Sequence, residues 1–264
     1  MKILVPTDFS DNAKNAFEFA KKIAKTSHGT ITLLYAYYNI YDFAAQSSSI
    51  FVQIEEIANQ AMEELSADQD GECMVDQKIV QGSIATAVTS TAYRENYDLI
   101  IMGTQGASGI NKALIGSNTA HVIRDSRVPV LAVPFQATYD KIKEIVVSVE
   151  WDTTEKKFFE KLFQISQQWE WPFRTLHIKT EENDKSEHTI TGLMQFLEKN
   201  YPNIQHSTAM AEDIYEGINQ HLQEESDCLL VMFSKQRPFF EHLLSRGNIE
   251  KMAYHTHTPL LVLK

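Results

Sequence analysis

Short apolar runs alternate with longer amphipathic segments along the first half of the chain. An apolar run followed by a segment with apolar residues at helical spacing is typical of a strand followed by a helix. The expected strands are residues 3–6, 30–37, 77–80, 99–102 and 128–133, and the expected helices are residues 13–24, 52–65, 84–95 and 118–125. Ser10 or Asp11 is expected to cap the first helix, and Gly29 to end it. This alternation predicts a parallel α/β sheet with right-handed crossovers.

The second half of the chain repeats this layout. Residues 144–150 (EIVVSVE) resemble residues 2–8 (KILVPTD), and residues 258–263 (TPLLVL) resemble residues 128–133 (VPVLAV). Between these matches, strands are expected at 174–179 and 228–232, and helices at 191–200 and 215–224. A tandem duplication explains both matches. It predicts two domains, residues 1–137 and 141–264, joined by a linker within residues 135–139.

Composition and charge exclude several classes of function. The chain has 264 residues, of which 43% are hydrophobic, and a net charge of −11. The acidic excess is present in both halves and no basic block stands out, so nucleic acid is not an expected partner. No apolar run approaches the roughly 18 residues of a membrane helix, and the chain start does not resemble a signal peptide. Cys73 and Cys228 have no CxxC partner, and the whole pattern indicates a cytoplasmic protein with reduced thiols.

A loop rich in glycine carries the clearest chemistry. Gly103 and Gly106 follow the strand expected at 99–102, and Gly116 and Ser117 precede the helix expected at 118–125. Glycines at a strand-to-helix junction let backbone N–H groups approach a phosphate, and the helix N-terminus favours negative charge. Neither GxxxxGK[ST] nor GxGxxG is present, so phosphate binding would rest on backbone amides. A bare turn is the alternative interpretation.

Asp8 ends the first predicted strand and supplies the only side-chain carboxylate of the predicted site. The carboxyl ends of strands in an open α/β sheet form a ligand crevice, so the Asp8 carboxylate is expected there. It would accept hydrogen bonds from ribose hydroxyls or an adenine amino group, with helix capping or an ion pair as the alternative role. Asn118 would add an amide beside Ser117. No base or arginine is placed for hydrolysis of a γ-phosphate, so the pattern favours binding over catalysis.

Four groups of residues, taken in order, resemble the universal stress protein family in its tandem two-domain form. They are residues 6–10 (PTDFS), residues 98–103 (DLIIMG), the glycine pattern from 103 to 117, and residues 129–133 (PVLAV). The resemblance implies two tandem open parallel five-stranded α/β sheets, packed as a pseudo-twofold pair with residues 128–133 antiparallel to residues 258–263. Further pairing into a homodimer is left open. The resemblance also implies ATP or AMP outside the carboxyl ends of the strands, with the backbone of Ala36 pairing with the adenine edge.

The predicted cofactor-binding residues are Asp8, Ala36, Gly103, Gly106, Gly116, Ser117 and Asn118. No metal-binding cluster is predicted, and Mg²⁺ or Mn²⁺ would be held by the nucleotide phosphates. The resemblance implies a stress-response regulator in which ATP or AMP tunes the conformation or the association with a regulatory protein. A slow ATPase at the same site and a nucleotide-free scaffold are the alternatives.

The second half lacks the phosphate-binding glycines. When the closing prolines are aligned, the positions of Gly103, Gly106, Gly116 and Ser117 are taken by Phe233, Gln236, Arg246 and Gly247. Sliding the alignment by one residue does not restore the glycine pattern. Glu150 stands at the place of Asp8, beside the bulky Trp151. We therefore predict that the second domain does not bind ATP in the family's manner, and that it is structural or takes a different ligand.

Two further motifs have no place in this site. Trp169 and Trp171 flank Glu170 at a helix-to-strand junction, where they would form a recognition surface or pack. His255 and His257 have a spacing that can ligate a metal, but no other ligands accompany them, so surface or packing roles are expected.

Overall fold

A computed structural model shows the fold of the chain as two compact units. The first unit ends at Phe135 and the second begins at Gln136. The structure describes residues 1–37, 47–67, 73–104, 115–180, 187–201, 203–225, 227–234 and 258–264. The boundaries expected at residues 137 and 141 stay a prediction, as does the packing of the two units against each other.

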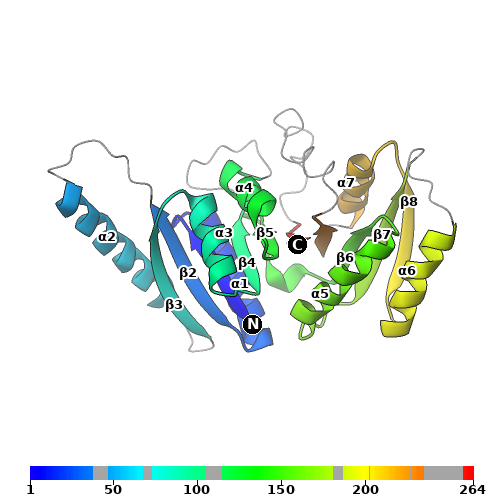
Figure 1. The fold of residues 1–264 in the computed structure, drawn as a ribbon, viewed down its shortest axis with the longest axis horizontal. Helices are drawn as coiled ribbons and strands as arrows, with labels where there is room; N and C mark the ends of the chain where they lie inside the picture. Colours follow the sequence, from blue (N-terminus) through cyan, green and yellow to red (C-terminus); the bar gives the residue numbers. More distant parts are fainter. Residues whose placement is uncertain are drawn as a thin grey trace. The chain divides into compact units, whose positions relative to one another are not determined.

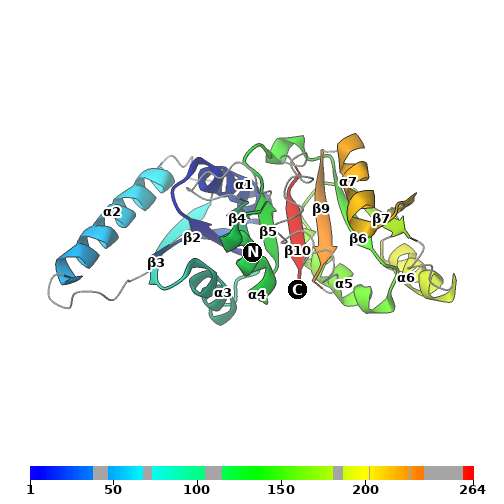
Figure 2. The same ribbon diagram turned by 90° about the horizontal axis from the view of Figure 1, so that it is seen from above.

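The first unit is an open sheet of five parallel strands in the order β3-β2-β1-β4-β5 (Figure 1). Its elements in chain order are β1 (Lys2–Thr7), α1 (Asp11–Ser27), β2 (Thr30–Tyr37), α2 (Ser47–Ala67), β3 (Met74–Gln81), α3 (Ile84–Arg94), β4 (Leu99–Gly103), α4 (Ser117–Asp125) and β5 (Val130–Val133). Helix α1 covers one face of the sheet, and α3 and α4 cover the other (Figure 2). This alternation confirms the expected α/β class.

The second unit has the same strand order, β8-β7-β6-β9-β10, and its strands are also parallel. Its elements are the short helix η1 (Tyr139–Lys141), β6 (Glu144–Val149), the short helix η2 (Thr153–Glu155), α5 (Lys156–Ser166), β7 (Phe173–Lys179), α6 (Glu187–Asn200), β8 (Gln205–Met210), α7 (Ile214–Glu224), β9 (Cys228–Phe233) and β10 (Leu260–Leu263). The order of β6, β7, β8, β9 and β10 within the sheet matches that of β1, β2, β3, β4 and β5. The tandem repeat is therefore present in the fold as well as in the sequence.

Helix α1 illustrates how the sequence sets the ends of an element. The Ser10 hydroxyl accepts a hydrogen bond from the Ala13 N–H at 3.2 Å, which satisfies one of the amides left over at a helix start. The helix ends at His28, whose φ of 48° is left-handed, one residue before the glycine expected to stop it. Gly29 is instead required for space, because a Cβ there would lie 2.6 Å from the Met1 carbonyl oxygen.

Strand β8 was not expected from the sequence. Its residues, QHSTAM, contain no apolar run, and its side chains are exposed or half-buried. Among the described strands β8 pairs only with β7, just as β3 pairs only with β2. Each of these edge strands carries an exposed methionine at one end, Met74 (66% exposed) on β3 and Met210 (79% exposed) on β8. A strand that is open on one side needs less apolar surface, and this removes the pattern by which strands are predicted.

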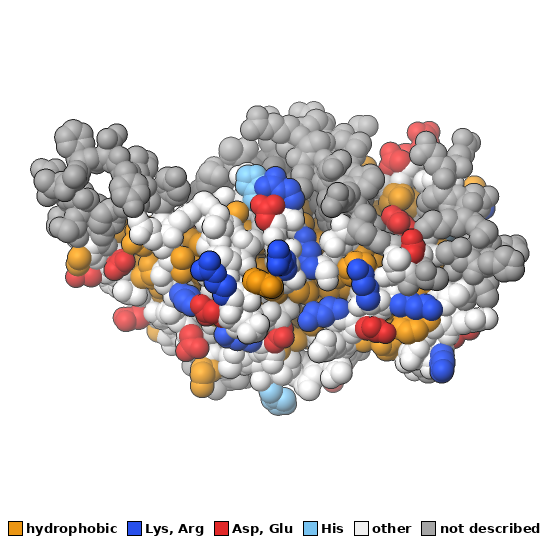
Figure 3. Space-filling model, viewed as in Figure 1, with side chains coloured by type: hydrophobic (Ala, Val, Ile, Leu, Met, Phe, Trp, Pro, Cys, Tyr) orange, Lys and Arg blue, Asp and Glu red, His pale blue; other side chains and the backbone are white. Residues whose placement is uncertain are grey.

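Acidic and basic side chains are interspersed over both units on the face drawn in Figure 3. Within the described ranges, no helix is long and apolar enough to cross a membrane.

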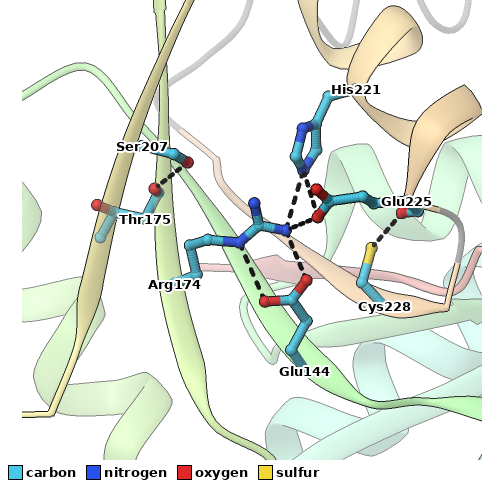
Figure 4. A network of polar contacts seen from close by, with 7 residues as sticks. All are labelled: Glu144, Arg174, Thr175, Ser207, His221, Glu225 and Cys228. Carbon is cyan, nitrogen blue, oxygen red and sulfur yellow. Dashed lines mark hydrogen bonds and ion pairs between the residues drawn. The ribbon is translucent and has the colours of Figure 1, made fainter.

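A network of charged side chains joins three elements at the amino-terminal end of the second sheet (Figure 4). Arg174 on β7 donates from Nε and Nη2 to the Glu144 carboxylate on β6, at 3.0 and 2.5 Å. The same guanidinium contacts the Glu225 carboxylate at the end of α7 and lies 3.4 Å from His221 Nε2. The Arg174 side chain is only 14% exposed. A forked guanidinium–carboxylate pair of this kind fixes β6, β7 and α7 in one geometry.

Candidate functional site

A cavity opens at the carboxyl ends of β1, β2 and β4 in the first unit. Its described lining comes from these strands, from the first turns of α1, α3 and α4, and from the loop after β1. Six of the seven predicted binding residues line it, namely Asp8, Ala36, Gly103, Gly116, Ser117 and Asn118. The seventh, Gly106, lies outside the described residues. The fold thus brings together side chains and amides from four separate segments of the sequence.

Asp8 follows β1 and forms the start of a tight loop. Its Oδ1 accepts hydrogen bonds from the Ser10 amide at 3.1 Å and from the Ser10 hydroxyl at 2.5 Å. Between them, Phe9 has a left-handed φ of 62°, and its ring contacts that of Tyr35 at a centroid distance of 5.1 Å. The Asp8 carboxylate therefore supports the cap of α1 and lines the cavity at the same time. Helix capping was the alternative to ligand binding at Asp8; the contact with the cap residue is present, and ligand binding stays a prediction.

Ala36 offers backbone groups rather than a side chain. The ladder between β2 and β1 ends at the pair of Tyr35 with Thr7, whereas the ladder between β2 and β3 continues to Tyr37. The Tyr37 carbonyl accepts from the Gly82 amide at 2.8 Å, so it points towards β3. Because backbone groups of successive strand residues point in opposite directions, the N–H and C=O of Ala36 point towards the cavity, past the end of β1. This orientation suits in-plane hydrogen bonding to a planar ring.

Gly103 is required by its contact with α1. A Cβ at this position would lie 2.8 Å from Asn12 Nδ2 and 3.0 Å from the Asn12 carbonyl oxygen. The sequence had explained this glycine by the approach of a ligand, so the structure adds a second neighbour that excludes a side chain. The Thr119 hydroxyl donates to the Gly103 carbonyl at 2.8 Å and ties α4 to the end of β4.

The amino terminus of α4 points its first amides to the cavity without a side-chain cap. Gly116 is the N-cap residue and forms no capping hydrogen bond, and the first turn contains no acidic residue. The Gly116 amide donates to the Thr104 carbonyl at 2.5 Å, so it is not available to a phosphate as the sequence had suggested. The amides of Ser117 and Asn118 belong to the four that a helix leaves unpaired. Together with the helix dipole, amides in this position favour negative charge.

Several lining residues were not predicted. They are Pro6, Thr7, Ala13, Leu34, Ile84, Met102 and Thr119. Thr7 belongs to the PTDFS motif, and Thr119 lies two residues beyond Ser117 at a helix start. Both could therefore have been predicted from the motif residues beside them. Ile84 opens α3 after the Gly82 turn, and only the packing of α3 beside β2 brings it to the cavity.

In the second unit a bulky side chain, Phe233, stands at the position that corresponds to Gly103. Phe233 pairs with Leu263 on the neighbouring strand as Gly103 pairs with Val133, so the alignment on the closing prolines is the correct one. Phe233 is fully buried, and its ring stacks on that of Phe158 at 4.9 Å. The residues aligned with Gly106, Gly116 and Ser117 lie outside the described residues.

The loop after β6 encloses a carboxylate of its own. Glu155 is fully buried, and its two oxygens accept from the amides of Glu150 at 3.0 Å and Asp152 at 3.2 Å. Trp151 has a φ of 54°, close to the 62° of Phe9, and is only 3% exposed. The left-handed residue that follows β1 thus has a counterpart after β6, where the loop folds around the Glu155 carboxylate.

In the part of the chain that the structure describes, no group of three or more His, Cys, Asp or Glu residues could hold a metal ion. His255 and His257 are not among the described residues. Neither cysteine forms a disulfide; Cys73 is half-buried and Cys228 is buried. Burial raises the pKa of the Cys228 thiol to about 12, which makes it a poor nucleophile at neutral pH.

The fold and the site together define an open parallel α/β protein with a crevice at the carboxyl ends of its strands. Residues 1–134 match the family model of the universal stress protein family, so the chain belongs to that family. A universal stress protein from Thermus aquaticus is 29% identical over 134 residues, covering 50% of this chain and 96% of that protein.

Solved structures extend the likeness to the second unit. The crystal structure of a universal stress protein from Archaeoglobus fulgidus has a TM-score of 0.74 at 16% identity and covers 100% of this chain and 98% of that one. This match shows a shared fold over both halves. A crystal structure of a universal stress protein in complex with cAMP, 26% identical, covers 50% of this chain and 96% of that one with a TM-score of 0.40.

Proposed function

We propose that the first unit binds an adenine nucleotide, ATP or AMP, and that its occupancy tunes the conformation of the protein or its association with a regulatory partner. The convergence of six predicted residues on one cavity carries this proposal. Family membership agrees with it, because the chain matches the universal stress protein model over the whole of this unit.

Each part of a nucleotide has a chemically matched place in the cavity. The unpaired amides of Ser117 and Asn118 and the Ser117 hydroxyl suit the phosphates, at the positive end of α4. The Asp8 carboxylate suits the ribose hydroxyls. The backbone N–H and C=O of Ala36 suit the donor and acceptor edge of adenine. Mg²⁺ or Mn²⁺ would be held by the phosphates, as is common for nucleotide-bound cations.

The described lining favours binding over hydrolysis. Phosphoryl transfer needs a positioned water and positive charge near the γ-phosphate. Among the described lining residues there is no lysine, arginine or histidine, and Asp8 is the one carboxylate. We therefore place this unit among nucleotide-responsive binding modules rather than ATPases.

Titration calorimetry with ATP, AMP and cAMP, with and without Mg²⁺, tests the proposal. Two variants address separate parts of the site. Ser117→Asp adds a negative charge where the phosphates would lie, and is expected to weaken ATP binding by more than about tenfold through repulsion. The same carboxylate complements the helix dipole of the uncapped α4, so the free protein should gain about 0.5 kcal/mol of stability. Ser117→Asn is the neutral control.

Asp8→Asn removes the charge but keeps Oδ1 as an acceptor for Ser10, and should weaken ATP binding about tenfold. Asp11→Asn is the matched control, because the Asp11 side chain is 80% exposed and does not line the cavity. No binding heat with any of the three nucleotides would refute the proposal. Binding that is unchanged in both Ser117→Asp and Asp8→Asn would place the nucleotide elsewhere.

A further inference from the structure

A second and larger cavity lies in the second unit, at the opposite end of the sheet from the strand carboxyl ends. Its volume of about 720 Å³ is within the range of small-molecule pockets. It is bounded by the carboxyl-terminal ends of α5 and α6 and by the segments that lead into β7 and β8. Its location makes it independent of the nucleotide site proposed above.

Five aromatic side chains line this cavity: Phe163, Trp169, Trp171, Phe173 and Tyr201. Neighbouring rings are in contact, with centroid distances of 5.6 Å between Trp169 and Trp171 and 4.9 Å between Phe163 and Phe173. Trp169 is buried at 5% exposure, while the other four rings are half-buried. The two tryptophans therefore combine the packing and surface roles that the sequence left open.

The polar lining of this cavity carries negative charge only. Glu160 on α5 and Glu170 before β7 are exposed at its edge, and neither forms an ion pair with any described residue. No lysine, arginine or histidine belongs to the described lining. Burial, and next the Glu160 charge, raise the pKa of the Tyr201 hydroxyl, which agrees with a negative local potential. The buried indole N–H of Trp169 has no acceptor among the described residues.

We propose that this cavity binds a small organic cation, such as an alkylated ammonium group. Aromatic faces attract cations through their electron-rich centres, and quaternary ammonium groups are bound in cages of such rings. The two carboxylates add charge attraction and disfavour anions such as nucleotides. An uncharged apolar ligand would use the rings but gain nothing from Glu160 and Glu170.

Tryptophan fluorescence can test this proposal, because the chain has only three tryptophans and two of them line the cavity. Trp151→Phe leaves Trp169 and Trp171 as reporters, and a phenylalanine already occupies the equivalent left-handed position in the first unit. Choline is the probe, titrated at ionic strength matched with NaCl. Its uncharged isostere, 3,3-dimethylbutan-1-ol, is the comparison. We expect a saturable change with choline and at least about fivefold weaker binding of the isostere.

Charge removal separates a cation site from a general apolar groove. Glu160→Gln with Glu170→Gln should weaken choline binding about tenfold without changing the thermal midpoint. Glu63→Gln with Glu212→Gln removes the same charge from exposed positions outside the cavity and should leave choline binding unchanged. Equal binding of choline and its isostere, no saturable response to choline, or full choline affinity in the cavity variant would each overturn the proposal.

Discussion

His206 shows how burial changes a titratable side chain in the second unit. Its Nδ1 lies 2.8 Å from the Thr175 hydroxyl on β7, while Nε2 is buried without a partner among the described residues. The ring also meets Trp151 edge-on, at a centroid distance of 5.3 Å. Burial lowers the pKa of His206, and the Glu198 charge opposes this shift only in part. The folded protein therefore favours the neutral imidazole.

A lowered folded pKa makes the stability of the second unit depend on pH. In the unfolded chain His206 has the ordinary pKa of about 6.5, so below that pH the unfolded state binds more protons than the folded state. Stability should fall as pH drops from 7.5 to 5.5. His206→Asn keeps an acceptor for Thr175 and should reduce this loss, measured as the thermal midpoint across that pH range. His28→Asn, at an exposed position, should follow the wild type.

Single glycines show what the sequence could and could not predict. Gly103 was expected because the loop after β4 is rich in glycine, and it does line the cavity. Its closest neighbour, Asn12, lies on α1 and could not be identified without the packing of that helix on β4. Gly116 was expected to present its amide to a ligand, but Thr104 accepts that hydrogen bond. Sequence patterns identify such positions, whereas hydrogen-bond partners depend on contacts between distant segments.

At the scale of elements, Arg174 links β6, β7 and α7. Arg174→Met would leave the Glu144 and Glu225 carboxylates without their shared partner, at a cost of about 2 kcal/mol in the free energy of unfolding. Urea unfolding followed by circular dichroism measures this cost. Arg124→Met is the matched control, because the Arg124 side chain is 61% exposed and pairs with its neighbour Asp125. A loss below about 0.5 kcal/mol at Arg174, similar to that of the control, would contradict a structural role.

Most elements could be predicted, because the strands contain clear apolar runs and the helices have apolar residues at helical spacing. Strands β4 and β9 are nearly all buried on both faces, so their runs of apolar residues were plain in the sequence. Strand β8 was not predicted, because it lies at the edge of its sheet and carries mostly polar residues. Residues 205–210 (QHSTAM) are extended because they form backbone hydrogen bonds with β7. A pairing between distant segments leaves no pattern within the six residues themselves.

At the scale of the whole molecule, the two units share a topology but differ in the chemistry at their strand ends. The first has uncapped helix amides and a carboxylate at its cavity. At its own strand ends, the second has a buried aromatic ring that packs against α5 and a glutamate enclosed by the loop after β6. The groups on which the proposed nucleotide site rests therefore belong to the first unit.

This asymmetry predicts one nucleotide per chain. Equilibrium dialysis with ATP should saturate at a ratio close to one nucleotide for each 264-residue chain, whatever the state of assembly. Ser117→Asp should weaken the binding of that single equivalent as a whole, with no part of the binding left at the wild-type affinity. A ratio near two, or half of the wild-type binding remaining in the variant, would show that the second unit also takes a nucleotide.

The exposed methionines of the edge strands bear on oxidative damage. Met74 and Met210 are open to solvent, whereas Met62, Met102 and Met232 are buried. Peroxide converts an exposed thioether to a sulfoxide more readily than a buried one. The new S=O groups would form at the ends of strands whose other side chains are largely polar, far from the apolar interior. Mild oxidation therefore adds polarity to the sheet edges and leaves the core intact.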